Sequence, residues 1–330
     1  MKLYNSKITG VGIGIAKRVI DNNFFEKIVE TSDEWIRSRS GIIERRFVDK
    51  DESTIDVALD AARQAIKNSN TDVLDIDLII FATTTADYVC PPSVGMAQDA
   101  LGAKNAAGFD LNAGCSGLVY AIITANQYIA TGNYKKILVI GAEAISKFLN
   151  FKDRSTCILF GDGASAVIME RNDNENSEGI IAFDLGLDGS GYEYIIRYAG
   201  GSRIPITKEM IDQDKHWLTM QGKAVFKFAV SVVPQTIKKV LENTKYSLKD
   251  VDMIIPHQAN NRIIDSVAKQ LELPSEKFYT NIQKYGNTAA ASVGIALKEA
   301  IDDGKVKKGD LVILVGFGTG LTYATCLMRI

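Results

Sequence analysis

The chain has 330 residues, of which 46% are hydrophobic and 24% are charged, and its formal net charge is −2. This composition is typical of a soluble globular protein and excludes disordered and fibrous chains. The near-neutral charge, without a basic block, argues against nucleic acid as a partner. No run approaches about 18 uninterrupted apolar residues, so we expect no membrane span. The first 20 residues have neither a long apolar region nor a small-residue cleavage site, so we expect no signal peptide.

Short apolar runs alternate with helical stretches along the chain, which favours an α/β architecture. We expect strands at residues 78–82, 107–111, 137–141, 164–169, 252–256 and 311–315. Because successive residues of these runs are apolar, both faces of each strand are expected to be buried. We expect helices at residues 53–69, 116–130, 224–243, 259–271 and 288–302.

The chain also contains an internal repeat with an offset of 175 residues. Residues 74–80 (LDIDLII) reappear as residues 249–255 (KDVDMII). The same offset relates Asn112 to Asn287 and connects one further pair of expected strands. Three matches in one order indicate two homologous α/β halves, packed around a pseudo-twofold axis.

This repeat suggests where the halves begin and end. We expect the first half at residues 1–172 and the second at residues 173–330, with the boundary in the polar segment 171–178. Residues 179–222 precede the repeated part of the second half. We therefore expect them to be an insertion that forms a cap or a wall of the substrate site.

Four cysteines lie far apart in the chain, and no CxxC pair occurs. We therefore expect free thiols in a reducing compartment, and neither a disulfide framework nor a zinc site. Cys90, Cys157 and Cys326 are expected to be ordinary small side chains.

Cys115 differs from the other cysteines because it lies between an expected strand and an expected helix. The positive end of the helix dipole favours thiolate, so we expect the pKa of Cys115 to fall and its sulfur to be nucleophilic. Gly114 and Gly117 on either side permit the sharp strand-to-helix turn that exposes a nucleophile.

Only two histidines are present, and His216 lies in a charged stretch where we expect a surface role. His257 leaves the carboxyl end of an expected buried strand, where sites gather in α/β sheets. Asn287 opens a helix, for which an N-cap role is the ordinary expectation. However, its repeat mate Asn112 lies three residues before Cys115, so we expect Cys115, His257 and Asn287 to converge between the halves.

Together these segments resemble the β-ketoacyl-acyl-carrier-protein synthase III family of thiolase-fold condensing enzymes, along almost the whole chain. The resemblance is carried by residues 31–36 (TSDEWI), 39–42 (RSGI), 112–117 (NAGCSG), 153–154 (DR), 160–164 (FGDGA), 256–260 (PHQAN), 286–288 (GNT) and 316–318 (GFG). It implies a thiolase-like fold layered α/β/α/β/α. It also implies an acyltransferase that needs no cofactor and works as a cytoplasmic homodimer.

The resemblance implies a catalytic triad of Cys115, His257 and Asn287. Cys115 would take an acyl group from an acyl-CoA primer, and malonyl-acyl-carrier-protein would then lose CO2. His257 and Asn287 would stabilise the resulting enolate, while the backbone N–H groups of Cys115 and Thr319 would form an oxyanion hole. The products would be 3-oxoacyl-acyl-carrier-protein, CO2 and CoA, in the initiation of type II fatty acid biosynthesis.

Binding residues are implied by the same resemblance. The CoA adenine would lie between Trp35 and Arg154, and further CoA contacts would come from Thr31, Arg39, Gly222, Phe226 and Asn260. Acyl carrier protein would dock on Lys227, Arg262 and Lys269. The acyl pocket would include Leu218 and, reaching across the dimer, Cys90.

Three positions depart from the family pattern. Thr319 stands where a glycine is common, Cys90 stands near a position that is commonly a large aromatic, and Gln270 replaces a carrier-facing lysine. Cys90 would allow a longer or branched primer, and Gln270 would weaken carrier docking.

Three other functions compete with condensation. They are a condensing enzyme or acyltransferase of secondary metabolism with the same site, a papain-like cysteine hydrolase and a catalytically silent scaffold. The presence of both His257 and Asn287 favours condensation, and the internal repeat argues against the hydrolase.

Overall fold

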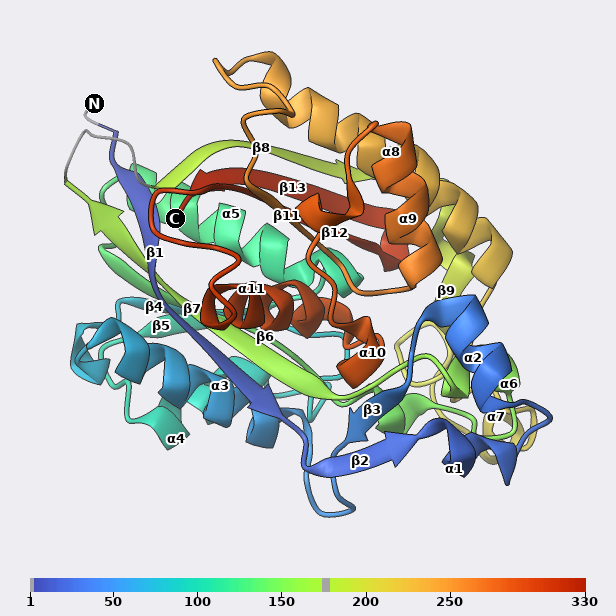
Figure 1. Ribbon diagram of the computed structural model, residues 1–330. Coiled ribbons are helices and arrows are strands. Elements are labelled where there is room, and N and C mark those ends of the chain that lie inside the picture. Colours follow the sequence, from blue (N-terminus) through green and yellow to red (C-terminus); the bar gives the residue numbers. More distant parts are fainter. Residues whose placement is uncertain (1–2, 174–178) are drawn as a thin grey trace.

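The computed structural model describes residues 3–173 and 179–330, which form five stacked layers (Figure 1). The first sheet has the strand order β1-β7-β6-β4-β5. Its strands are β1 (Asn5–Ile15), β4 (Leu78–Ala82), β5 (Ala107–Leu111), β6 (Lys136–Glu143) and β7 (Gly163–Asn172). The second sheet has the order β11-β12-β13-β8. Its strands are β8 (Gly179–Leu187), β11 (Met253–Pro256), β12 (Leu311–Gly318) and β13 (Thr322–Arg329).

Helices form the other three layers. They are α3 (Thr54–Ser69) and α4 (Ser93–Leu101) outside the first sheet, α5 (Gly117–Ala130) and α11 (Ser292–Asp302) between the sheets, and α8 (Gly222–Glu242) and α9 (Asn261–Gln270) outside the second sheet (Figure 1). This is the expected thiolase-like α/β/α/β/α order. The position of α5 between two sheets explains why its sequence is apolar nearly all round.

Most of the shorter elements lie together beside the layers, at the lower right of Figure 1. Two small sheets pair β2 (Arg18–Asp21) with β3 (Glu44–Phe47) and β9 (Ile195–Arg197) with β10 (Leu218–Met220). The short helices are α1 (Asn22–Glu26), α2 (Asp33–Ser40), α6 (Arg154–Cys157), α7 (Lys208–Asp212) and α10 (Ile282–Tyr285). No helix in the described part of the chain is both long and apolar enough to cross a bilayer.

The two sheets repeat one topology. In the first, β4 pairs in parallel with β6, β6 pairs antiparallel with β7, and β7 pairs antiparallel with β1. In the second, β11, β12, β13 and β8 pair in the same way and in the same order. The counterpart of β5 is reduced to a single parallel bridge between Ile254 and Phe278. The duplication inferred from the sequence is therefore visible in the strand order.

All six expected strands and all five expected helical regions are present, but some bounds differ. The region expected as one helix at 288–302 begins with a 3₁₀ turn, Ala289–Ala291, before α11. Residues 179–187, expected to belong to an insertion, form β8 of the second sheet, so the part outside that sheet begins at residue 188. In the polar segment 171–178, Arg171 and Asn172 end β7, and residues 174–178 lie outside the described residues.

Besides β8, the large sheets contain two strands that were not expected from the sequence, β1 and β13. Of these, β1 carries three alternate glycines. A Cβ atom on Gly10, Gly12 or Gly14 would lie 2.4, 2.2 or 1.9 Å from a backbone oxygen of α3. The glycines therefore allow α3 to pack closely against β1.

Candidate active site

Two equivalent turns form the centre of the molecule, between the sheets. Gly114–Ser116 and Ala289–Ala291 are both 3₁₀ turns, and they lead into α5 and α11 respectively. In each turn an asparagine side chain accepts a hydrogen bond from the backbone N–H two residues on: Asn112 from Gly114 at 3.3 Å, and Asn287 from Ala289 at 2.9 Å. The repeat therefore extends to the details of the turns that carry the candidate residues.

The two turns also share a left-handed backbone. Gly114 has φ 56° and Ala289 has φ 43°. Glycine adopts this conformation readily, whereas alanine is strained in it, and such strain gathers at functional sites. The second turn keeps the geometry although its sequence offers no glycine there.

Cys115 lies in the first turn and is 7% exposed. Burial, together with the Glu143 carboxylate, raises the pKa of the thiol to about 12. The backbone N–H groups of Thr319 and of Cys115 itself favour the thiolate and lower the pKa, but by less. The expected fall of this pKa is therefore wrong for the ligand-free site, since removal of the sulfur from water outweighs the nearby donors.

Glu143 is a fully buried carboxyl at the end of β6. It accepts hydrogen bonds from the backbone N–H of Thr84 at 3.1 Å and from the hydroxyls of Thr84 and Thr85 at 2.9 and 2.7 Å. Burial nevertheless raises the pKa of Glu143 to about 7. Because Thr84 and Thr85 line the same cavity as Cys115, Glu143 holds one wall of the site.

His257 follows β11 and is 1% exposed. Its backbone N–H donates to the carbonyl of Val315 at 2.7 Å, and its ring packs edge-on against Phe317 at 5.1 Å between centroids. Its Nδ1 atom lies 2.5 Å from Oγ of Ser292. Burial lowers the pKa of His257 to about 3, so the imidazole is neutral at physiological pH.

Asn287 precedes the second turn and is fixed by both backbone and side chain. Its backbone N–H donates to the carbonyl of Leu159, and its carbonyl accepts from the N–H of Gly161, both at 2.9 Å. Because Oδ1 already accepts from Ala289, the Nδ2 amide is the end of the side chain that remains to donate. Asn287 can therefore cap the turn through Oδ1 and, at the same time, donate a hydrogen bond through Nδ2.

A cavity of about 1150 Å³ joins these groups. Cys115, His257 and Asn287 all line it, as does Thr319. Of the other candidates, Trp35, Arg39, Leu218, Gly222, Phe226 and Asn260 line it as well. Arg262 lines a smaller adjoining hollow together with Gly222, Lys223 and Phe226.

Several candidates lie outside the cavity lining of this chain: Thr31, Cys90, Arg154, Lys227 and Lys269. Cys90 is exposed on the loop between β4 and α4, next to Tyr88 and Val89, which are also exposed. It therefore does not reach the acyl pocket of its own chain.

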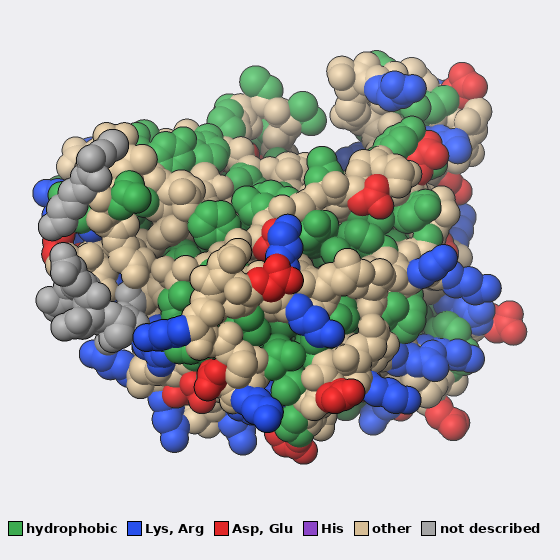
Figure 2. Space-filling view, turned by 90° about the horizontal axis from the view of Figure 1, so that it is seen from above, with side chains coloured by type: hydrophobic (Ala, Val, Ile, Leu, Met, Phe, Trp, Pro, Cys, Tyr) green, Lys and Arg blue, Asp and Glu red, His purple; other side chains and the backbone are tan. Residues whose placement is uncertain are grey.

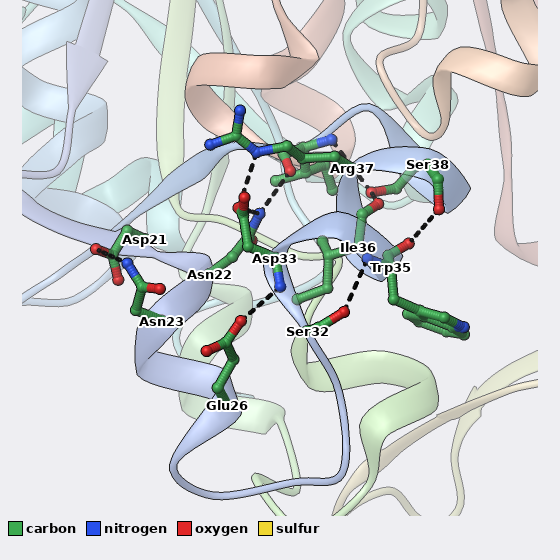
Figure 3. A network of polar contacts seen from close by, with 12 residues as sticks. Asp21, Asn22, Asn23, Glu26, Ser32, Asp33, Trp35, Ile36, Arg37 and Ser38 are labelled. Atoms are coloured by element: carbon green, nitrogen blue, oxygen red, sulfur yellow. Dashed lines mark hydrogen bonds and ion pairs between the residues drawn. The ribbon is translucent and has the colours of Figure 1, made fainter.

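Trp35 lies on α2, which is ordered by polar contacts (Figure 3). The Ser32 hydroxyl caps the helix by accepting from the Trp35 N–H at 3.1 Å, and Asp33 pairs with Arg37 at 2.8 Å. The indole points away from this network (Figure 3). The guanidinium carbon of Arg154 lies 4.8 Å from the indole centroid, so the two groups stack directly on each other. An adenine could enter between them only if Arg154 moved.

Basic side chains are exposed on α8 and α9, and one of them, Arg262, lines the hollow that adjoins the cavity. Lys227 on α8 and both Arg262 and Lys269 on α9 are exposed, and none forms a salt bridge with another described residue. Figure 2 shows Lys and Arg side chains gathered on the right-hand side, where α8 begins in Figure 1. Gln270 donates to the Val230 carbonyl at 3.0 Å, so it ties α9 to α8.

The sequence analysis missed Glu143, Lys223 and Ser292. Glu143 is a charged residue two positions after the expected buried strand 137–141, and that signal was available. Lys223 lies one helical turn before Lys227 on the same face of α8. Ser292 could have been found only through the repeat, as the mate of Gly117.

Family models match two parts of the chain. Residues 109–189 match the model described as 3-oxoacyl-[acyl-carrier-protein] synthase III, and residues 241–330 match the one for its C-terminal part. None of the groups of His, Cys, Asp and Glu in the described ranges could hold a metal ion.

Full-length relatives agree with these models. The chain is 48% identical to the β-ketoacyl-[acyl-carrier-protein] synthase III of Clostridioides difficile, over 98% of this chain and 97% of that protein. It is 46% identical to the protein of the same name from Caldanaerobacter subterraneus, again over 98% and 97%. The crystal structure of 3-oxoacyl-[acyl-carrier-protein] synthase III from Aquifex aeolicus superposes with a TM-score of 0.91 at 42% identity, over 98% of this chain and all of that chain.

Proposed function

Because this chain belongs to the 3-oxoacyl-[acyl-carrier-protein] synthase III family, we propose how its own side chains divide the work of condensation. The protein is a condensing acyltransferase of fatty acid biosynthesis and catalyses the initiating condensation. An acyl-CoA primer and malonyl-acyl-carrier-protein give 3-oxoacyl-acyl-carrier-protein, CO2 and CoA. The main support for these residue roles is that the two equivalent turns bring Cys115 and Asn287 to the same cavity, which His257 also lines.

In the first half-reaction, Cys115 attacks the thioester carbon of the acyl-CoA. The carbon–sulfur bond to CoA breaks, the acyl group stays on Cys115, and the thiol proton ends on the CoA sulfur. The backbone N–H groups of Cys115 and Thr319 stabilise the oxyanion of the tetrahedral intermediate. This role is supported by the effect of both N–H groups on Cys115, since they favour its thiolate form and lower its pKa. Since a backbone donor does not depend on its side chain, threonine can replace glycine at 319.

In the second half-reaction, His257 and Asn287 donate hydrogen bonds to the thioester carbonyl of the malonyl group. Its carbon–carbon bond to the carboxylate breaks, CO2 leaves, and the electron pair forms an enolate stabilised by the two donors. The carbanion attacks the acyl carbon on Cys115, the bond between that carbon and the cysteine sulfur breaks, and Cys115 leaves as a thiolate that takes a proton from water. A neutral imidazole and an amide suffice because the loss of CO2, rather than a strong base, generates the carbanion. For the same reason we propose that the reaction needs no cofactor.

CoA and acyl carrier protein enter from the open end of the cavity. We propose that Trp35 and Arg154 hold the CoA adenine after they separate, with Thr31 and Arg39 nearby and Gly222, Phe226 and Asn260 along the tunnel. The hydroxyl oxygen of Thr31 is buried without a hydrogen-bond partner in the described structure, which favours a ligand contact there. Lys227, Arg262 and Lys269 would attract the acidic carrier protein.

A second copy of the chain completes the site in this proposal. On β8, an edge strand, the alternate residues Ile181, Phe183, Leu185 and Leu187 are all more than a third exposed. An exposed apolar stripe on a sheet edge favours association. The exposed loop with Cys90 would then reach the partner's acyl pocket beside Leu218. A mass in solution of twice 36.0 kDa would support the homodimer, and a monomer would refute it.

We propose that the chain has the domain organisation expected from the sequence. The halves would be residues 1–172 and 173–330, and the cap expected at 179–222 would comprise mainly residues 188–221. Tyr192, Ile195, Leu218 and Met220 of this cap line the cavity, which supports its role as a substrate wall. The free nucleophilic thiol fits the reducing cytoplasm.

A product assay tests the proposed reaction and its alternative. Purified enzyme is incubated with a panel of acyl-CoAs and with either malonyl-acyl-carrier-protein or malonyl-CoA, and the products are identified by mass. The proposal predicts 3-oxoacyl-acyl-carrier-protein with matched release of CO2. Acyl transfer to another acceptor without CO2 would instead indicate an acyltransferase of secondary metabolism.

A further inference from the structure

The side chain next to the catalytic imidazole is a serine with no role so far. Oγ of Ser292 lies 2.5 Å from Nδ1 of His257, and Ser292 is only 2% exposed. The same oxygen accepts a hydrogen bond from the backbone N–H of Gln258 at 3.4 Å. Ser292 is the first residue of α11, so the helix fixes it relative to the strand end that carries His257.

These two contacts determine which nitrogen of His257 carries the proton. The amide of Gln258 can only donate, so Oγ of Ser292 accepts there and its single proton is free to point elsewhere. Among the described residues, Nδ1 of His257 is the only acceptor recorded for that proton. If Nδ1 carried a proton instead, the buried hydroxyl would have no acceptor, which costs free energy. The hydrogen bonds around Oγ of Ser292 therefore favour a neutral ring that is protonated at Nε2.

The internal repeat indicates that this contact is not needed for the turn itself. With the offset of 175 residues, Ser292 corresponds to Gly117 and His257 corresponds to Ala82. These two positions also meet in the first half, where a Cβ atom on Gly117 would lie 3.2 Å from Cβ of Ala82. The first half thus forms the same turn and helix start without a hydroxyl at the position that corresponds to Ser292. The second half has serine at this position and histidine beside it, whereas the first half has glycine and alanine at the two corresponding positions.

We propose that Ser292 is a positioning residue that holds His257 with its proton on Nε2, ready to donate to the malonyl thioester carbonyl. Nδ1 is occupied by Ser292, so Nε2 is the nitrogen left for the cavity. The edge-on contact with Phe317 constrains the plane of the ring, and the hydrogen bond from the backbone N–H of His257 to Val315 anchors the backbone. The part that concerns donation to the substrate rests on the proposed function, whereas the part that concerns the tautomer does not.

Nitrogen-15 NMR of the full-length protein tests the tautomer directly. The chain has only two histidines, so imidazole labelling gives two ring systems, and His216→Gln assigns the other one. Without substrate, we expect His257 to carry its proton on Nε2, while its unprotonated Nδ1 accepts a hydrogen bond from Ser292. A ring protonated at Nδ1 would overturn the proposal without any assay of activity.

Substitutions test the consequence. Ser292→Gly, which introduces the residue of the first half, and Ser292→Ala should mix the two tautomers, and Ser292→Thr should restore the wild-type signal. We expect the first two to slow decarboxylation of malonyl thioester about tenfold, as the loss of one hydrogen bond gives. Acylation of Cys115 should be unchanged. Unchanged tautomer and decarboxylation in both would overturn the proposal. A third result is also informative: the tautomers behave as expected, but the wild-type enzyme does not decarboxylate malonyl thioester. This result would refute the proposed function but would still support Ser292 as the residue that positions His257.

Discussion

Gly318 lies against Cys115 so closely that a Cβ atom on Gly318 would be 2.8 Å from the cysteine sulfur. The φ angle of Gly318 is 165°, an extended value that any residue adopts, so backbone strain does not require glycine here. What requires it is the space for the sulfur. The end of β12 therefore helps to determine the position of the nucleophile.

We expect Gly318→Ala to fold normally and to slow acylation of Cys115 by about 100-fold, because a displacement of about 1 Å at a reacting centre costs that much. The rate of acyl-enzyme formation, followed by intact mass, measures it. Gly95→Ala is the matched control, since a Cβ atom there meets nothing within 4 Å. Wild-type acylation in Gly318→Ala would show that the contact does not constrain the sulfur.

Replacing the two donors separates the half-reactions. His257→Ala and Asn287→Ala should still be acylated by acyl-CoA but should lose decarboxylation by about 100- to 1000-fold, the typical effect of removing one oxyanion donor. Release of CO2 from malonyl thioester, measured beside acyl-enzyme mass, distinguishes the steps. His216→Ala is the control because it changes the other histidine. A donor variant that decarboxylates at the wild-type rate would remove that residue from the mechanism.

The buried carboxyl of Glu143 makes stability depend on pH with a definite sign. Burial raises its pKa from 4.5 to about 7, so the folded protein binds this proton more tightly than the unfolded chain. Its contribution to stability is fully present below pH 4.5 and is lost as the pH rises through about 7. As the pH rises from 4.5 to about 7, we expect the Tm of Glu143→Gln to increase relative to the Tm of the wild type. The exposed Glu276→Gln should follow the wild type, and a pH-independent difference for Glu143→Gln would contradict the burial account.

Carrier docking is tested by reversing one charge. Arg262→Glu should weaken turnover of malonyl-acyl-carrier-protein much more than acylation by acyl-CoA, mainly through slower association. The loss should shrink at higher salt, because exposed charges are screened. Lys104→Glu, in the loop after α4, provides a control of equal charge change. An equal loss with both substrates would remove the docking role and favour a CoA-linked acceptor.

Much of the fold could be predicted because the buried strands are apolar at successive positions. The repeat then aligned Asn112 with Asn287 and brought Cys115 and Asn287 together before any geometry was known. The two unexpected strands at the edges of the large sheets, β1 and β8, have one partly exposed face. Glycines in β1 and exposed apolar residues in β8 hide the alternation that identifies such strands.

The chemistry of the site was harder to predict, because it depends on contacts between distant segments. The pKa of Cys115 rises because burial outweighs the helix start, and burial is a property of the folded chain. Ser292 is 35 residues from His257 in the sequence, and its contact depends on how α11 packs beside β11. The direct stacking of Arg154 on Trp35 likewise joins residues that no local pattern connects.

The central claim is that Cys115 carries the acyl group between the two half-reactions, and intact mass measurement tests it most directly. Wild-type enzyme and Cys115→Ala are each incubated with acyl-CoA and then with malonyl-acyl-carrier-protein. We predict that the wild type gains the mass of one acyl group on Cys115 and loses it as 3-oxoacyl-acyl-carrier-protein forms, whereas Cys115→Ala gains nothing. An acyl adduct on Cys115→Ala, or a wild-type adduct that malonyl-acyl-carrier-protein does not discharge, would contradict the account.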